Sequence, residues 1–185
     1  MSELFPVHTL DTAPLAGREI LAQINQKYGF VPNLMGVMAN APPLLKGYVT
    51  LSKLLTETSL SPLEQQILLL IVSAENHCHY CVAVHSAGAK RAGATAEIVE
   101  SVRTERPLKD AKLEVLRRFA ITVVKTRGFP EARDIEVFLS AGYGHNQILE
   151  VILAIGLKTL SNYTNHIAHT PLDAAFASER LDKTA

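Results

Sequence analysis

The sequence predicts an all-α fold. Apolar residues recur at intervals of three and four through almost the whole chain, as they do on the buried faces of helices. Glycine and proline punctuation falls between these periodic segments. The stretch Ser61-Pro62-Leu63-Glu64 also combines an N-cap serine, a proline at the first helical position and a glutamate at the third, which together mark a helix start. We therefore expect a bundle of helices that forms a single domain over residues 1–185.

In the first half of the chain, glycine and proline set the helix boundaries. Gly29 ends the first helix, because glycine readily adopts the left-handed conformation that closes helices. Pro42 and Pro43 open the third helix, since proline suits the first helical turn. The helix that begins after Ser61 is apolar nearly all round, so it should lie in the core. The helices predicted here cover about residues 16–28, a short segment from 33 to 39, 42–56 and 61–74.

In the second half, polar caps and glycine set the boundaries. Asn76 is a good N-cap for a helix that begins near Cys78 and stops at Gly93. Thr170-Pro171-Leu172-Asp173 repeats the pattern of hydroxyl, proline and acid, and so predicts a terminal helix. The helices predicted before it cover about residues 78–92, 95–102, 110–126, 130–141 and 145–169.

Composition argues against several classes of function. The chain has 185 residues, with 18 basic and 18 acidic side chains and an isoelectric point near 7.1, so we expect neither nucleic acid nor a membrane surface as a partner. The apolar run 67–72 is too short to cross a bilayer. The start at Met1 has neither the basic nor the apolar region of an export signal, which favours the reducing cytoplasm. Two cysteines in that compartment would not remain a static disulfide.

The clearest functional signal is the stretch 75–85, which holds both cysteines of the chain. Cys78 and Cys81 form a Cys-x-x-Cys pair, and His85 follows four residues later. On a helix these three residues share one face. Two sulfurs so placed can close a disulfide, and an imidazole one turn away can carry the proton that thiolate chemistry moves. Unpaired N–H groups at the helix start would favour a thiolate, so a redox-active dithiol without a cofactor is the preferred interpretation.

Two other interpretations of the cysteines stay open. A structural zinc site needs four ligands, and the usual second pair downstream is missing. His77 and His79 could complete the set only by leaving the helical face. An inert buried pair is also possible, because a free cysteine often behaves as a small apolar residue. The histidines and tyrosine around the pair argue against that purely apolar role.

A shift of 84 residues reveals a possible internal repeat. It aligns residues 66–85 with residues 150–169, so that an apolar helix is followed in both by a polar pair and a histidine. Cys78 and Cys81 then correspond to Asn162 and Asn165, and His85 to His169. We interpret this as a duplicated helix pair in which one copy kept the sulfur chemistry, although chance similarity of two apolar helices is the alternative.

The Cys-x-x-Cys-x-x-x-His helix, preceded by a buried helix, resembles the alkyl hydroperoxidase D-like branch of the carboxymuconolactone decarboxylase superfamily. Residues 29–34 (Gly-Phe-Val-Pro-Asn-Leu), 73–76 (Ser-Ala-Glu-Asn) and 162–168 (Asn-Tyr-Thr-Asn-His-Ile-Ala) look like the longer "peroxidase-related" members. The resemblance covers roughly residues 28–175. It implies an all-helical fold, a homo-oligomer, and a peroxidase or disulfide-reductase activity that uses the two cysteines without metal or haem.

The sequence departs from that family at two positions. The proton relay of the family has a glutamate twelve residues before the first cysteine, where this chain has Gln66, and a histidine before the second cysteine, where it has Tyr80. An amide cannot accept a proton as a carboxylate does, so another acid is needed. Glu75, close to the cysteines, is the local candidate. Glu150, aligned with Gln66 by the repeat, is the distant one.

The sequence therefore predicts a thiol-dependent, antioxidant peroxidase-like oxidoreductase. By the resemblance, Cys81 attacks a small hydroperoxide, Cys78 resolves the product to a disulfide, and a dithiol reductant or its carrier protein restores both thiols. His85 serves as acid and base, and His79 faces the rim of the site. The stronger N–H field at Cys78 argues for the opposite order of the two cysteines. A carboxymuconolactone-decarboxylase-type enzyme, a redox sensor and a zinc-binding protein remain alternatives.

Overall fold

The computed structural model describes residues 4–181, and these are helical with no strand. The all-α prediction is therefore confirmed. The first and last residues of the helices agree closely with the predicted ones, except that a 3₁₀ turn stands in place of the predicted C-terminal helix. They are α1 (Leu15–Tyr28), α2 (Asn33–Met38), α3 (Pro42–Thr56), α4 (Pro62–Glu75), α5 (His79–Arg91), α6 (Ala96–Arg103), α7 (Ala111–Lys125), α8 (Ala132–Ser140), α9 (His145–Ala168) and the 3₁₀ turn η1 (Ala174–Glu179).

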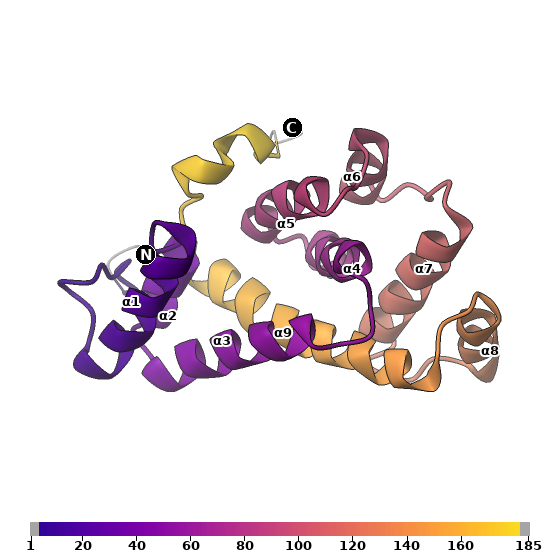
Figure 1. Cartoon of the computed structure of the whole chain (residues 1–185), viewed down its shortest axis with the longest axis horizontal. Helices are drawn as coiled ribbons and strands as arrows, with labels where there is room; N and C mark the ends of the chain where they lie inside the picture. Colours follow the sequence, from indigo (N-terminus) through magenta and orange to yellow (C-terminus); the bar gives the residue numbers. More distant parts are fainter. Residues whose placement is uncertain (1–3, 182–185) are drawn as a thin grey trace.

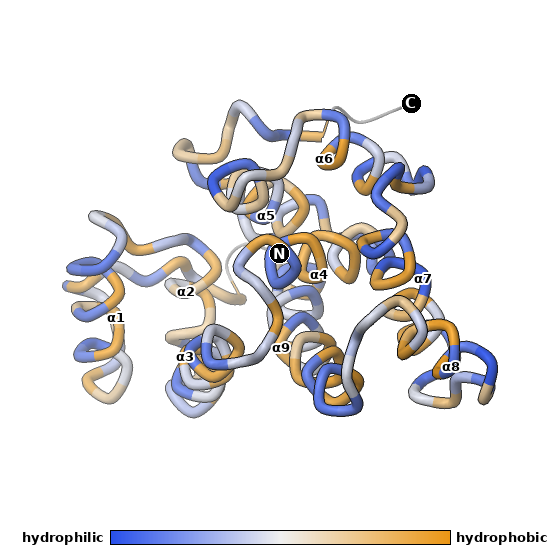
Figure 2. Tube along the Cα trace, turned by 45° about the vertical axis from the view of Figure 1, so that its right-hand side comes forward, coloured by the Kyte–Doolittle hydropathy of each residue, from blue (hydrophilic) through white to orange (hydrophobic). Residues whose placement is uncertain are grey.

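Helix α4 is the centre of the arrangement (Figure 1). It packs against α5, α6, α7 and α9, and α9 continues along α3 toward the helices of the N-terminal part. Helices α1 to α3 lie on one side of this centre, and α6 to α8 lie on the other (Figure 1). The tube coloured by hydropathy shows α4 as the most continuously apolar segment (Figure 2).

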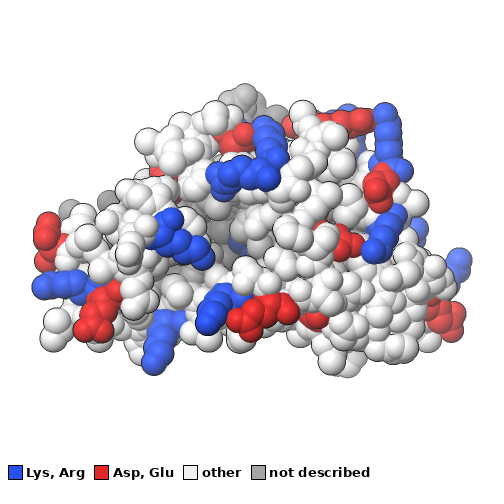
Figure 3. All heavy atoms as spheres, viewed as in Figure 1, with Lys and Arg blue, Asp and Glu red and all other residues white. Residues whose placement is uncertain are grey.

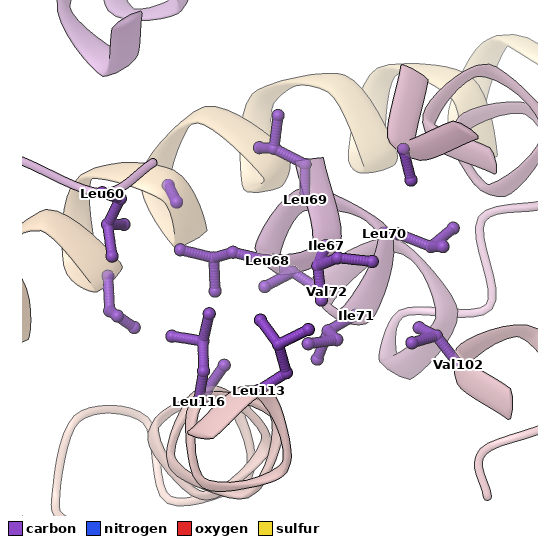
Figure 4. Close-up of a cluster of buried hydrophobic side chains, with 14 of the residues drawn as sticks. Leu60, Ile67, Leu68, Leu69, Leu70, Ile71, Val72, Val102, Leu113 and Leu116 are labelled. Atoms are coloured by element: carbon purple, nitrogen blue, oxygen red, sulfur yellow. The ribbon is translucent and has the colours of Figure 1, made fainter. Parts of the chain in front are cut away.

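The sequence of α4 accounts for its position. Its start is a complete capping box: Ser61 Oγ accepts from Glu64 N at 3.2 Å, and Glu64 Oε2 accepts from Ser61 N at 2.9 Å. Each residue from Ile67 to Val72 is at most 5% exposed. Leu113 and Leu116 of α7 point toward this helix in the main apolar cluster (Figure 4). A helix that is apolar on all sides can bury its surface only where neighbouring elements cover every side.

A second apolar cluster contains both cysteines. It joins Cys78, Tyr80 and Cys81 to buried side chains of the N-terminal helices. Those side chains include Leu21, Leu34, Met38 and Leu45. The thiols therefore lie where α1 to α3 meet the start of α5.

The start of the cysteine helix differs from the prediction. Asn76 is the C-cap of α4 and not the N-cap of α5; the N-cap is Cys78 itself. His77 has φ 53°, a left-handed conformation that turns the chain between the two helices. The backbone N–H of Cys78 donates to Ser73 O at 2.9 Å, as in a helix C-terminal motif. Asn76 thus caps the C-terminus of α4, and Cys78 takes the N-cap position of α5.

The second copy of the proposed repeat does not form a helix pair. Residues 150–168 are part of one continuous helix, α9, so the duplicated pair predicted from the alignment is wrong in this respect. The break at Asn76 and His77 corresponds to Leu160 and Ser161, which remain helical. The hydroxyl of Ser161 bonds to Leu157 O and Lys158 O within the same helix, so nothing there interrupts the backbone ladder.

The predicted terminal helix is also wrong. Only the 3₁₀ turn η1 follows, and it begins after Asp173. The carboxylate of Asp173 accepts from the backbone N–H of Asn33 at 2.9 Å and from the hydroxyl of Tyr80. Because tertiary contacts occupy this carboxylate, it does not close the capping box that the sequence suggested.

Within residues 4–181, none of the helices combines the length and the apolar character needed to cross a membrane.

The burial of α4 predicts a large difference between two leucine truncations. Leu70→Ala should lower the free energy of unfolding by about 2–5 kcal/mol, because Leu70 is fully buried and its removal leaves a cavity. Leu15→Ala is the matched control, since Leu15 is 79% exposed and its loss should cost at most about 0.5 kcal/mol. Denaturant unfolding of both variants measures the difference. Equal losses would contradict the central position of α4.

Candidate active site

Two free thiols form the centre of the site. Cys78 and Cys81 lie 3.5 Å apart at the start of α5, with exposed fractions of 1% and 2%. Cys78 is the N-cap, and Cys81 lies in the first turn, so the three-residue spacing brings the side chains together as expected. Both thiols can therefore close a disulfide with little movement of the backbone.

Helix α9 adds a buried lysine to the site. Lys158 is 1% exposed, and its Nζ lies 3.0 Å from His85 Nε2. Its ammonium charge also lowers the pKa of the Cys81 thiol. On the other side of the ring, His85 Nδ1 lies 3.2 Å from Gln66 Oε1 on α4. Because the lysine donates to Nε2, the ring carries its proton on Nδ1 and donates it to the amide oxygen.

The charges of this group follow from burial and from the lysine. Burial and the adjacent Lys158 charge both lower the pKa of His85 well below 6.5, so its ring is neutral at pH 7. Burial alone would raise the pKa of Cys81, but the Cys78 thiol and the Lys158 ammonium hold it well below its usual value. The hydrogen bond to Cys81 and burial raise the pKa of Cys78. Cys81 is therefore the thiolate and Cys78 its thiol donor.

Amides from α9 complete the surroundings of the sulfurs. Asn165 Nδ2 lies 3.2 Å from Cys81 Sγ and 3.7 Å from Cys78 Sγ. Asn162 accepts a hydrogen bond from Asn76 Nδ2 at 2.9 Å. Asn162 Nδ2 and Asn165 Oδ1 are buried without a partner in the structure. Asn165 thus has a free acceptor next to the thiols, and Asn162, one turn earlier on the same helix, has a free donor.

The close approach of Gln66 to His85 requires a glycine. A Cβ at position 88 would overlap Gln66 Oε1, so Gly88 on α5 leaves the space that the amide occupies. This packing is local evidence that the contact between Gln66 and His85 belongs to the fold.

Residues 42–106 match the sequence model of the Carboxymuconolactone decarboxylase family. The matched segment runs from α3 through α6 and contains both cysteines and His85. The resemblance inferred from the sequence is therefore confirmed.

Solved structures show the same fold over nearly the whole chain. The alkylhydroperoxidase AhpD core, a peroxidase-related protein from Ralstonia eutropha JMP134, has a TM-score of 0.82 at 20% identity, over 97% of each chain. A peroxidase-related protein from Silicibacter sp. TM1040 has 0.79 at 23%, over 93% of this chain and 91% of that one. The debrominase Bmp8 in complex with 2,3,4-tribromopyrrole has 0.73 at 16%, over 87% of each. No curated protein matches the sequence.

Gln66 and Tyr80, the two residues that depart from the family pattern, differ in whether they reach His85 and the thiols. Gln66 does contact the histidine, through its amide oxygen. Tyr80 points away from this group: its hydroxyl accepts from Leu34 N at 3.3 Å and donates to Asp173. Burial and Asp173 raise the pKa of Tyr80, so it stays neutral. The tyrosine fixes the C-terminal segment to α5 and carries no proton to the sulfurs.

Neither candidate acid contacts the thiols or His85. Glu75 forms an ion pair with Lys125 at 3.4 Å, and its surface pocket is lined by Glu105 and residues of α7. Glu150 accepts from the backbone N–H of Ser59 at 3.0 Å and from its hydroxyl at 2.9 Å. The alignment with Gln66 therefore does not bring Glu150 near that residue, because the N-terminal part of α9 faces the loop before α4.

The remaining histidines lie outside the group. His77, His79 and His169 are exposed, in accordance with the rim position expected for His79. Within the described part of the chain, no group of three or more His, Cys, Asp and Glu side chains could hold a metal ion. The thiols thus lack the additional ligands that a structural zinc site uses.

Sequence reasoning missed Lys158 and placed Asn165 only as a counterpart of Cys81. A signal was present: Lys158 is the one charged residue between Glu150 and His166. A lysine is almost never fully buried unless it is paired. A lone lysine in a core helix therefore indicates a buried partner, although not which one.

The contact between Gln66 and His85 predicts the effect of restoring a carboxylate. Gln66→Glu should raise the pKa of His85 by about one unit or more, because an anion next to the ring favours the imidazolium. An NMR titration of the His85 ring measures it. Gln23→Glu, on the exposed face of α1, is the control for the change in net charge and should leave that pKa unchanged. An unshifted His85 in Gln66→Glu would show that the amide oxygen does not face the ring.

Proposed function

We propose that this protein is a thiol-dependent peroxidase-like oxidoreductase in which Cys78 and Cys81 are the redox pair. The observation that carries the proposal is the 3.5 Å separation of two free thiols whose pKa values are shifted in opposite directions. A thiolate beside a thiol is the arrangement that one oxidation and one resolution step require. The match to the family and the likeness to peroxidase-related structures agree with it.

In the first step, the Cys81 thiolate attacks the terminal oxygen of a hydroperoxide. The O–O bond breaks, Cys81 becomes a sulfenic acid, and the alkoxide leaves as an alcohol after taking one proton. This order agrees with the lowered pKa of Cys81. Polar groups of Lys158 and His85 are in place to handle the proton.

In the second step, Cys78 resolves the sulfenic acid. Its thiol loses a proton, its sulfur attacks Cys81, and a disulfide and water form. An external dithiol, or a carrier protein that bears one, then reduces the disulfide and is itself oxidised. The 3.5 Å separation of the thiols allows this bond without rearrangement of α5.

The surroundings favour a small substrate and a homo-oligomer. Both thiols are almost fully buried, so only a small hydroperoxide suits the site. The face in Figure 3 is hollowed between α2 and α5, with basic side chains near the hollow. Exposed apolar side chains line one side of α9, which favours contact with further copies of the chain. They are Leu149, Ile152, Tyr163 and Ile167.

Two alternatives make different predictions. A carboxymuconolactone-decarboxylase-type enzyme has no use for a dithiol, so its turnover would survive loss of both cysteines. A redox sensor would form the disulfide but would not turn over. Steady consumption of hydroperoxide with a dithiol reductant separates the peroxidase from both.

Oxidation with a hydroperoxide should produce an intramolecular disulfide between Cys78 and Cys81. The intact mass should fall by two hydrogens, and alkylation should find no free thiol, because the sulfurs already lie close enough to bond. Two alkylatable thiols in folded protein after complete exposure to the oxidant would end the dithiol mechanism.

Single cysteine variants should separate the two roles. Cys81→Ser should abolish consumption of hydroperoxide, because it removes the thiol whose pKa is lowered. Cys78→Ser should give one equivalent of sulfenic acid on Cys81 and no recycling, as trapped by a sulfenate reagent and located by mass spectrometry. A sulfenate that appears only on Cys78 would reverse the order.

A further inference from the structure

The buried lysine of α9 has no carboxylate partner within the described residues. Lys158 is 1% exposed, and none of the ion pairs formed by residues 4–181 includes it. Removing an ammonium group from water is strongly unfavourable unless an anion compensates its charge. The structure must therefore either supply an anion of another kind or hold a neutral amine.

The neighbours of Lys158 identify that anion. His85 Nε2, at 3.0 Å, accepts a hydrogen bond but carries no negative charge. Gln66 on α4 binds the opposite nitrogen of the ring, which leaves Nε2 as the acceptor. The Cys81 sulfur lies one turn before His85 on α5 and 3.2 Å from Asn165 Nδ2, which belongs to the same helix as the lysine, so it is the neighbour of the ammonium that can ionise. A thiolate paired with Lys158 neutralises the buried charge.

We propose that Lys158 is a catalytic residue, whose ammonium pairs with the Cys81 thiolate and gives its proton to the oxygen that leaves the hydroperoxide. His85 is then a positioning residue, which holds the ammonium toward the sulfur and is itself fixed by Gln66. This inference rests on the proposed peroxidase-like function for its second half. The ion pair alone does not depend on any reaction with peroxide.

The proton balance of the cycle follows. Cys81 as thiolate attacks the hydroperoxide, the O–O bond breaks, and the alkoxide takes a proton from Lys158, which leaves a neutral amine. The amine takes the proton of the Cys78 thiol, Cys78 displaces hydroxide from the sulfenic acid, and Lys158 returns that proton to form water. The disulfide form therefore contains a neutral Lys158. Reduction by a dithiol supplies two protons, one to Cys78 and one to Lys158.

The other titratable groups around Cys81 stay neutral in the pH range in which the Cys81 thiol ionises. Burial raises the pKa of Tyr48 on α3 and of Tyr80 on α5, and a negative charge on Cys81 raises both further. The Cys78 pKa is also raised. The ionisation that the alkylation rates would report in this group is therefore that of Cys81.

The first test measures the ionisation of Cys81 without peroxide. In reduced Cys78→Ser protein, the rate of alkylation of Cys81 is followed from acid to alkaline pH. When Lys158→Met is combined with Cys78→Ser, the midpoint of the curve of alkylation rate against pH should rise by about one pH unit or more. Alkylation at neutral pH should slow at least about tenfold. Lys158→Arg, which keeps the charge, should retain most of the rate.

Two control variants separate the lysine from other causes. Lys109→Met removes a lysine whose side chain is 85% exposed and should leave the midpoint unchanged. His85→Ala should move it less than Lys158→Met does, because the neutral ring carries no charge and acts only through the position of the ammonium. A midpoint that is unchanged in Lys158→Met, or that moves as far in His85→Ala, overturns the assignment.

The second test uses the wild-type chain, so it decides the matter even where Lys158→Met fails to fold. Side-chain NMR of labelled lysine distinguishes an ammonium from a neutral amine at Lys158 in the reduced and disulfide forms. The signal should change from ammonium to amine on oxidation, because the thiolate is lost and the side chain stays buried. The same signal in both forms overturns the ion pair.

The outcomes also separate this inference from the proposed function. A shifted thiol midpoint in Lys158→Met without any consumption of hydroperoxide by the wild-type protein would keep the ion pair and reject the peroxidase. Consumption of hydroperoxide with an unshifted midpoint would keep the peroxidase and reject the role of Lys158.

Discussion

The contact of α9 with α4 and α5 is the constraint on which the site depends. Helix α4 is apolar all round and must be covered, and α9 covers it along one side while it also reaches the start of α5. The same helix carries Lys158 and Asn165, which therefore come to rest against the sulfurs. Burial of an apolar helix thus fixes the position of polar groups that make no contribution to the apolar core itself.

A single positive charge gives two chemically similar thiols different properties. Lys158 and the hydrogen bond from Cys78 favour the anion at Cys81, and that anion in turn raises the pKa of Cys78. Proximity to the helix start would favour Cys78, which is the N-cap of α5. The full charge of a buried lysine exceeds the partial charge of a helix terminus, so the tertiary contact decides the order.

The departures from the family pattern agree with this charge. Gln66 stands where the family relay has an acid, and it can receive the ring proton of His85 but not retain it. Neither Glu75 nor Glu150 substitutes for the acid, since Lys125 and Ser59 engage them elsewhere. The polar side chains around Cys81 are therefore those of Lys158, His85 and Gln66, and the Cys81 sulfur is the anion among them.

The sequence by itself determined the helices, the buried position of α4, the family and the pair of cysteines with His85, because these depend on spacing along the chain and on local caps. It could not determine what α9 brings to the thiols, since Lys158 and Asn165 lie 73 and 84 residues from their partners His85 and Cys81. The break at His77 and the use of Asp173 were likewise decided by tertiary contacts, which outweighed the local capping signals. Local pattern fixes which face of a helix is apolar, whereas only packing decides which polar atoms meet across it.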